Sequence, residues 1–134
     1  MVAGYAKRDD GIRQEIWLID VRKGSCALRN PPGDQGVTWG GEVDILTRLV
    51  QPLAEVDAAD KIVNRLPVHA IPWGFFTLQD AIDFAIFATR STIDAIRFQP
   101  RPKTVGGPID VLVMRQKGCK WIQRKELHGE SIDA

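Results

Sequence analysis

Few side chains in this sequence have the type and setting that catalysis requires. A serine or cysteine becomes a nucleophile when a base lies beside it, and Ser25 and Cys119 each follow a glycine in an expected hairpin turn. Cleavage of the Gly24-Ser25 bond would give Ser25 a free α-amine, which can act as that base. Cleavage before Cys119 would leave only a short C-terminal piece. Ser25 is therefore the candidate nucleophile, and an ordinary turn residue is the simpler interpretation.

Two pairs of glycines stand at junctions between expected elements. Gly40-Gly41 opens a helix, where free N–H groups can bind an anion, but Glu42 and Asp44 follow and would repel phosphate. Gly106-Gly107 lies between a helix and a strand. This second pair either makes a turn with a positive φ or lets the backbone approach a neighbouring group closely. The structural role is the favoured interpretation.

The sequence predicts no metal site and no cofactor. His69 and His128 have no ligand-forming residue three or four positions away, as a metal site on one helix face would need. Asp80 and Asp83 could form a pair of catalytic carboxylates. Acidic residues near the start of a helix more often interact with the helix dipole, and this is the preferred interpretation.

Composition excludes several classes of protein. The 134 residues carry a formal net charge of +1, with 44% hydrophobic and 26% charged residues, which predicts a single globular domain over residues 1–134. The balanced charge argues against a nucleic-acid-binding face. No apolar run approaches the roughly 20 residues of a membrane helix. The first ten residues lack the apolar core of a signal peptide, so we expect a cytoplasmic protein with neither nucleic-acid nor membrane partners.

The expected elements run in the order strands, helices, strands. Thr77 and Asp80 form a capping-box pattern that begins the clearest helix. Strands followed by helices favour an α+β fold, with an antiparallel sheet and the two main helices on one of its faces. The expected strands are 2–6, 15–21, 25–29, 37–39, 109–114 and 119–123, and the expected helices are 42–51, 77–98 and a short one within 54–66.

Four segments in this order resemble the C-terminal half of a proteasome-type subunit, a member of the N-terminal-nucleophile hydrolase superfamily. VAGYAKRDDGIRQEIWLIDVRKG at 2–24 is similar to a strand pair of that family, and the junction at 38–41 is similar to its small-residue entry into a helix. TLQDAIDFAIFATRSTIDAI at 77–96 resembles its long helix. TVGGPIDVLVMRQKGCKWI at 104–122 resembles its last hairpin.

The resemblance implies a layered α/β sandwich of antiparallel sheets covered by helices, incomplete at the N-terminus. It also implies two loops next to the active site. In the family, a serine before two glycines, itself preceded by an aspartate, supports the catalytic threonine. Val105 takes the serine position here, and residues 99–105 hold no aspartate. The site-adjacent residues implied are Thr38, Gly40, Gly41, Val105, Gly106 and Gly107.

Two functions remain open. A nucleophile at the N-terminus is expected in this family, and removal of Met1 would expose Val2, which has no nucleophilic atom. The first hypothesis is a non-catalytic subunit or fragment that acts in a homo- or hetero-oligomer through helices 42–51 and 77–98. The alternative is a threonine-type peptidase whose catalytic N-terminal half is supplied upstream or by another chain. A polypeptide substrate is expected only if that half exists.

Overall fold

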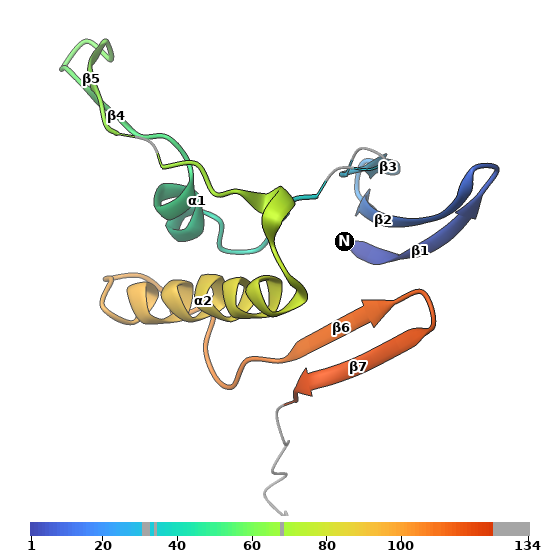
Figure 1. The fold of residues 1–134 in the computed structure, drawn as a ribbon. Helices are drawn as coiled ribbons and strands as arrows, with labels where there is room; N and C mark the ends of the chain where they lie inside the picture. Colours follow the sequence, from blue (N-terminus) through green and yellow to red (C-terminus); the bar gives the residue numbers. More distant parts are fainter. Residues whose placement is uncertain (31–32, 34, 68, 125–134) are drawn as a thin grey trace, which may run out of the picture. The chain divides into compact units, whose positions relative to one another are not determined.

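The computed structural model describes residues 1–30, 33, 35–67 and 69–124 (Figure 1). The chain divides into two compact units, one formed by Met1–Leu28 with Gly107–Ala134 and the other by Arg29–Gly106. Within the described residues the fold combines two α-helices with small sheets in which every strand pair is antiparallel. The expectation of an α+β fold with antiparallel strands is thereby confirmed.

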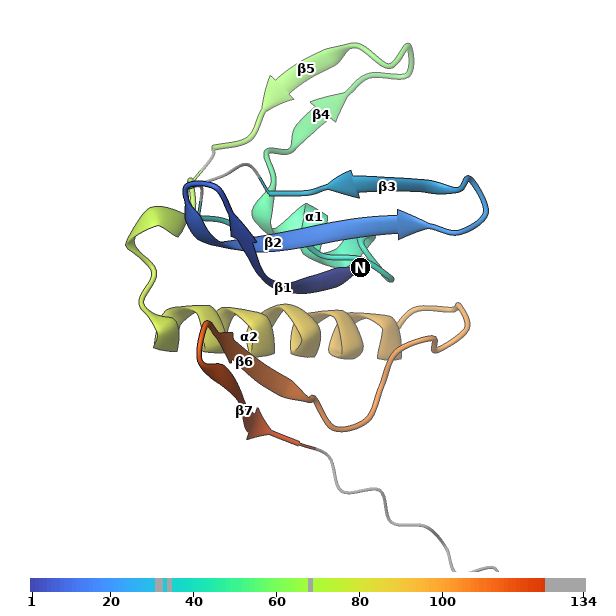
Figure 2. The same ribbon diagram turned by 90° about the vertical axis from the view of Figure 1, so that its right-hand side faces the viewer.

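The first unit contains a three-stranded sheet in the order β1-β2-β3 (Figure 2). β1 (Val2–Arg8) pairs with β2 (Gly11–Asp20), and β2 pairs with β3 (Ser25–Leu28). The turn into β3 forms locally, because the Asp20 carboxylate accepts the backbone N–H groups of Arg22 and Lys23. Gly24 completes it at a φ of +59°. These three strands match those expected near the N-terminus, with ends that differ by a few residues.

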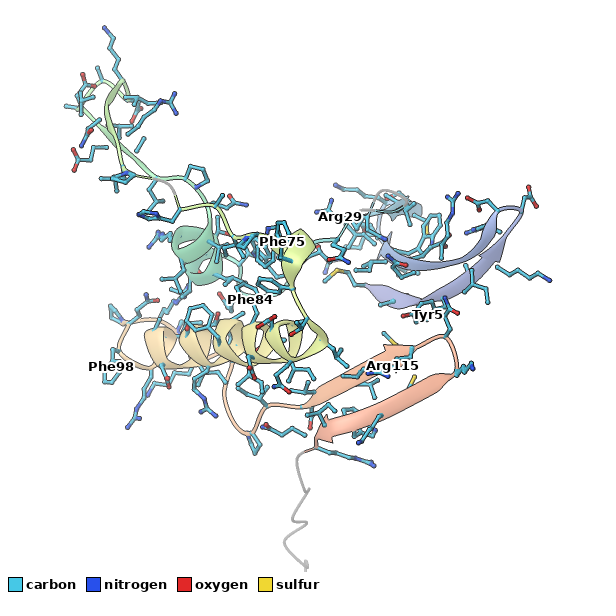
Figure 3. All side chains as sticks on the ribbon, in the orientation of Figure 1. Tyr5, Arg29, Phe75, Phe84, Phe98 and Arg115 are labelled. Atoms are coloured by element: carbon cyan, nitrogen blue, oxygen red, sulfur yellow. The ribbon has the colours of Figure 1, made fainter. Side chains whose placement is uncertain are left out.

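A second hairpin belongs to the same unit. β6 (Val111–Arg115) pairs with β7 (Gly118–Gln123), and Gly118 has a φ of +147° at the turn. The Tyr5 hydroxyl donates a long hydrogen bond of 3.4 Å to the carbonyl oxygen of Met114. Figure 3 accordingly shows Tyr5 beside the end of β6 that bears Arg115. The final hairpin expected from the sequence is confirmed.

The second unit is built around the helices α1 (Asp44–Val50) and α2 (Leu78–Arg97). α2 begins with the expected capping box: the Asp80 N–H donates to Thr77 Oγ1 at 3.2 Å, and the Thr77 N–H donates to Asp80 Oδ2 at 2.8 Å. Two backbone donors that the helix leaves unpaired are satisfied in this way. The buried side chains of the two helices are Ile45, Leu46, Ile82, Thr92 and Ile96.

An aromatic cluster joins the start of α2 to the short 3-10 helix η1 (Trp73–Phe75). The ring of Phe84 lies edge-on to that of Trp73, with centroids 5.0 Å apart, and Phe76 lies 5.2 Å from Trp73. Edge-to-face arrangements of this kind are preferred by aromatic quadrupoles. Trp73 therefore packs against two phenylalanine rings.

The expected helix within 54–66 is wrong. This segment forms the hairpin β4 (Ala54–Val56) and β5 (Ile62–Arg65), which extends from the end of α1 (Figure 1). The Asp57 carboxylate accepts the N–H groups of Ala59 and Lys61, and Asp60 has a left-handed φ of +59°. A helix needs repeating helical dihedral angles, so this turn prevents one. The β-branched residues on either side then pair as strands.

The expected strand at 37–39 is also wrong, because these residues form a loop. A strand needs a neighbouring strand to accept and donate its backbone hydrogen bonds. Trp39 is instead held through its side chain, since its indole N–H donates to Thr47 Oγ1 of α1 at 3.3 Å. Between β3 and this segment, residues 31, 32 and 34 lie outside the described part of the chain.

Candidate functional site

Two loops named by the family resemblance meet at one pocket in the second unit. The pocket has a volume of about 150 Å³ and lies where residues 39–42 and Val105 approach the helices α1 and α2. Gly40 and Val105 both line it, although they are far apart in the sequence. Thr38 is half-buried and does not belong to the lining. The lining residues are Trp39, Gly40, Glu42, Leu46, Ala88, Thr89, Thr92 and Val105.

Arg101 connects the two loops beside this pocket. Its guanidinium lies 3.5 Å from Glu42 Oε2 and 3.3 Å from Asp44 Oδ1. The Thr104 hydroxyl donates a hydrogen bond to the other carboxylate oxygen of Glu42. Two carboxylates and one guanidinium leave the group with a net charge of −1. This network holds the loop after α2 against the start of α1.

The pKa of Asp44 reflects this arrangement. Partial desolvation of the carboxylate raises the pKa, but the hydrogen bond and positive charge of Arg101 lower it more. The backbone N–H groups of Asp44 and Ile45 lower it further. The net direction is below the ordinary value of 3.8, so Asp44 is ionised at neutral pH. An ionised acid in the first turn also interacts favourably with the helix dipole.

The polar groups of the pocket are occupied by structural hydrogen bonds. The hydroxyls of Thr89 and Thr92 donate to the carbonyl oxygens of Ala85 and Ala88, one turn earlier in α2. Glu42 accepts from Thr104 and pairs with Arg101. The remaining lining is mostly apolar. A nucleophile needs a base that can take its proton, and the hydroxyls in this pocket are directed at helix carbonyls.

The glycines at the two junctions differ in their conformation. Gly41 and Gly107 have φ values of +82° and +83°, a region that residues with a Cβ rarely adopt. The backbone at Gly106 has no such φ, and a Cβ at Gly106 or Gly107 would meet no atom within 4 Å. The positive φ therefore explains why residue 107 is a glycine. Close approach of a neighbouring group explains neither Gly106 nor Gly107.

Ser25 lies in the other unit, as the first residue of β3, and is exposed. It pairs across the strands with Asp20, whose Oδ1 already accepts two backbone N–H groups of the turn. Cys119 is also exposed in a hairpin, one residue after the turn glycine Gly118. Each of these residues occupies a regular position in a β-hairpin, and neither lines the pocket described above.

The other candidate residues either form structural hydrogen bonds or do not gather into a group that could bind a metal. Asp80 forms the capping box, and Asp83 accepts a hydrogen bond from Gln79 at 2.9 Å. Among residues 1–30, 33, 35–67 and 69–124, no group of three or more histidine, cysteine or acidic side chains could hold a metal ion. His128 lies outside these residues. No helix in the same ranges has the length and apolar character needed to cross a membrane.

Sequence reasoning missed the network around Arg101. The acids Glu42 and Asp44 were interpreted only as charges that would repel phosphate, and Arg101 and Thr104 carried no motif. The available signal was an arginine shortly after the end of one helix and two acids at the start of another. Such charges pair only when the helices are packed, which periodicity does not reveal.

Comparison with known proteins gives no relative. No protein-family model, no curated protein and no solved structure matches the chain. The pocket and its loops therefore provide the basis for a functional proposal.

Proposed function

We propose that this chain is a proteasome-like member of the N-terminal-nucleophile hydrolase superfamily that acts as a non-catalytic, architectural subunit. In this proposal its antiparallel strands and helices belong to the layered sandwich of that family. The subunit contributes surface to a homo- or hetero-oligomer. It performs no peptide-bond hydrolysis by itself.

The observation that carries this proposal is the position of Val105. The resemblance places a supporting serine at this residue, and Val105 lines the same pocket as Gly40 of the other site-adjacent loop. An isopropyl group can neither donate nor accept a hydrogen bond, so it cannot orient a nucleophile there. The turn geometry of the family is compatible with Gly107, whose φ is +83°. The pocket thus combines the expected loops with an inert side chain.

Exposed apolar side chains on the helices support the role in assembly. Val43, at the N-terminus of α1, is 45% exposed and Leu49 within it is 55% exposed. Phe87 of α2 is 49% exposed, and Phe98 directly after α2 is 81% exposed. Contiguous apolar patches are typical of sites that bind another protein, and in this proposal these side chains contribute to such a patch. These residues lie at the helices 42–51 and 77–98 through which we expect contacts.

Reaction with an electrophilic peptide tests the catalytic part of the proposal. The purified chain is incubated with a peptide epoxyketone, and its intact mass is measured. We expect no covalent adduct, because no activated hydroxyl or thiol lies in the pocket. A stoichiometric adduct on Ser25, or on any other residue, would instead support the threonine-type peptidase alternative.

Two variants make this experiment sharper. Ser25→Ala removes the candidate nucleophile, and Val105→Ser restores the side chain that the resemblance expects. We expect both variants to remain unreactive, since the hydroxyl at 105 alone supplies support and not attack. The architectural part is tested separately by light scattering at about 100 µM chain, in the range where moderate interfaces associate. We expect a weight-average mass above that of one chain, and a mass that stays at one chain when the concentration is raised further would contradict assembly of the chain with itself.

A further inference from the structure

The outward side of α2 carries a regular stripe of exposed residues. Their spacing alternates between four and three positions, which places them along one face of a helix. All are classed as exposed, and the aromatic ring of Phe87 interrupts an otherwise charged series. The stripe, called the α2 stripe below, consists of Asp83, Phe87, Arg90, Asp94 and Arg97.

The central charges of the α2 stripe are Arg90 and Asp94. Among the described residues, the ion pairs involve neither Arg90 nor Asp94. They lie four positions apart on the helix, with the base before the acid. That order is the less favourable one for a pair within a helix. Arg97 extends its guanidinium over the ring of Phe98, 5.6 Å from the centroid.

We propose that a second copy of this chain docks antiparallel on the α2 stripe around a two-fold axis. Arg90 then faces the partner's Asp94, and Asp94 faces the partner's Arg90. Phe87 faces the partner's Arg97, which forms a cation–π contact, and the symmetric contact forms at the other end. This proposal rests on the assembly role proposed above and specifies its interface.

The order of the charges favours a second copy over an unrelated partner. A two-fold antiparallel pair requires a surface that is complementary to itself, so each cation must meet an anion when the helix is reversed. Reversing the segment 87–97 about its middle satisfies this condition for Arg90 and Asp94, and it places Arg97 opposite Phe87.

An exposed aromatic residue lies at the end of this interface. Phe98 is 81% exposed at the C-terminal end of α2 (Figure 3). In the proposed pair it lies beside the partner's Phe87, so that both rings lose contact with water. Burial of apolar surface favours association. The two ends of the stripe therefore contribute apolar contact, and its centre contributes specificity.

The length of the interface predicts a weak and reversible dimer. About three helical turns of each copy make contact, which buries less than the roughly 1,200 Å² of stable complexes. Exposed ion pairs are weakened by salt, because the screening length falls to about 3 Å at 1 M ionic strength. We expect association to rise with concentration up to several hundred micromolar and to decrease several-fold when salt is raised from about 50 mM to 500 mM.

Charge reversal provides the decisive experiment, measured by sedimentation velocity. In a pair of Arg90→Asp chains, positions 90 and 94 of both copies are acidic, so like charges face each other. In a pair of Asp94→Arg chains, both positions are basic and again repel. We expect each variant alone to raise the dissociation constant about tenfold or more. Mixed in equal amounts, the two variants restore every opposite pair and should associate as the wild type does. Restoration in the mixture cannot arise from a change within one chain.

The remaining outcomes separate the two proposals. If the wild type forms an oligomer and both single variants do so equally well, the α2 stripe is not the interface but the assembly role survives. If the wild type stays monomeric at every concentration, the pairing and the self-assembly part of the proposed function both fail. If the single variants lower the melting temperature while no sample changes mass with concentration, the stripe is covered within the chain and the pairing is rejected. Lys103→Asp, an exposed charge reversal outside the stripe, is the matched control and should leave association unchanged.

Discussion

The guanidinium of Arg101 lies 3.3 Å from the carboxylate of Asp44, across 57 positions of sequence. This contact connects the loop after α2 to the first turn of α1, and Glu42 shares the same guanidinium at 3.5 Å. The pocket lined by Gly40 and Val105 lies next to this connection. The position of the two loops therefore depends on one cation that faces two anions.

Removal of this cation should loosen the second unit. Arg101→Met keeps most of the apolar stem but leaves Glu42 and Asp44 as neighbouring like charges. We expect the melting temperature to fall by a few degrees, measured by circular dichroism at pH 7. Lys103→Met changes a cation of the same loop and should leave the melting temperature within about one degree. Equal melting temperatures for all three proteins would show that the Arg101 network does not hold the loops.

The capping box of α2 should contribute measurably to stability. Thr77→Ala removes the side-chain acceptor of the Asp80 N–H, which should cost about 1 kcal/mol in the free energy of unfolding. Thr89→Ala, in the middle of the same helix, removes a hydroxyl that donates only to Ala85 and should be neutral or stabilising. Urea denaturation followed at 222 nm compares the two. The idea fails if the Thr89 variant is the less stable.

Glu15 should remain ionised well into the acid range. Hydrogen bonds from Arg8 and then from Trp17 lower the pKa of Glu15 from 4.5 to about 2. A folded pKa below the unfolded one means that the stabilisation is fully present above pH 4.5. It is lost as the pH falls toward 2. NMR titration of the Glu15 side-chain carboxyl carbon measures the pKa, and Arg8→Met should return it toward 4.5. A value near 4.5 in the wild type would contradict the paired geometry.

The two adjacent glycines before the last hairpin should tolerate substitution differently. Gly107→Ala requires a residue with a Cβ to adopt a φ of +83°, which should cost about 1 kcal/mol or more in the free energy of unfolding. Gly106→Ala meets no atom within 4 Å at an ordinary φ and should be neutral or slightly stabilising. Denaturant unfolding of both variants checks the contrast. If Gly106→Ala were the more damaging, close approach at Gly106 would have to be reconsidered.

Most of the regular elements could be predicted, and the reasons are local. The helix α2 was recognised from the Thr77 and Asp80 capping pattern and from apolar residues at helical spacing. The hairpin β6–β7 was recognised from two apolar runs on either side of a turn ending in Gly118. The segment 54–66 was misjudged, because a short apolar run has no periodicity that distinguishes a strand from a helix. There the turn held by the Asp57 carboxylate makes the segment a hairpin.

The candidate site was predictable only in part. Gly40 and Val105 were singled out through a family resemblance, and the structure places both at one pocket. Glu42, Arg101 and Thr104 form the polar contacts of that region and carried no recognisable motif. Nothing local in a sequence indicates which distant charges will meet.

The sequence by itself determined the caps, the turns and the succession of strands and helices, since these depend on contacts between residues a few positions apart. Only the tertiary structure decided that the loop of Gly40 and the loop of Val105 share a pocket, and that Arg101 faces both Glu42 and Asp44. Such contacts join residues about 60 positions apart, and they form only once α1 has packed on α2. Side-chain type sets the strength of such contacts, whereas the fold determines whether they form.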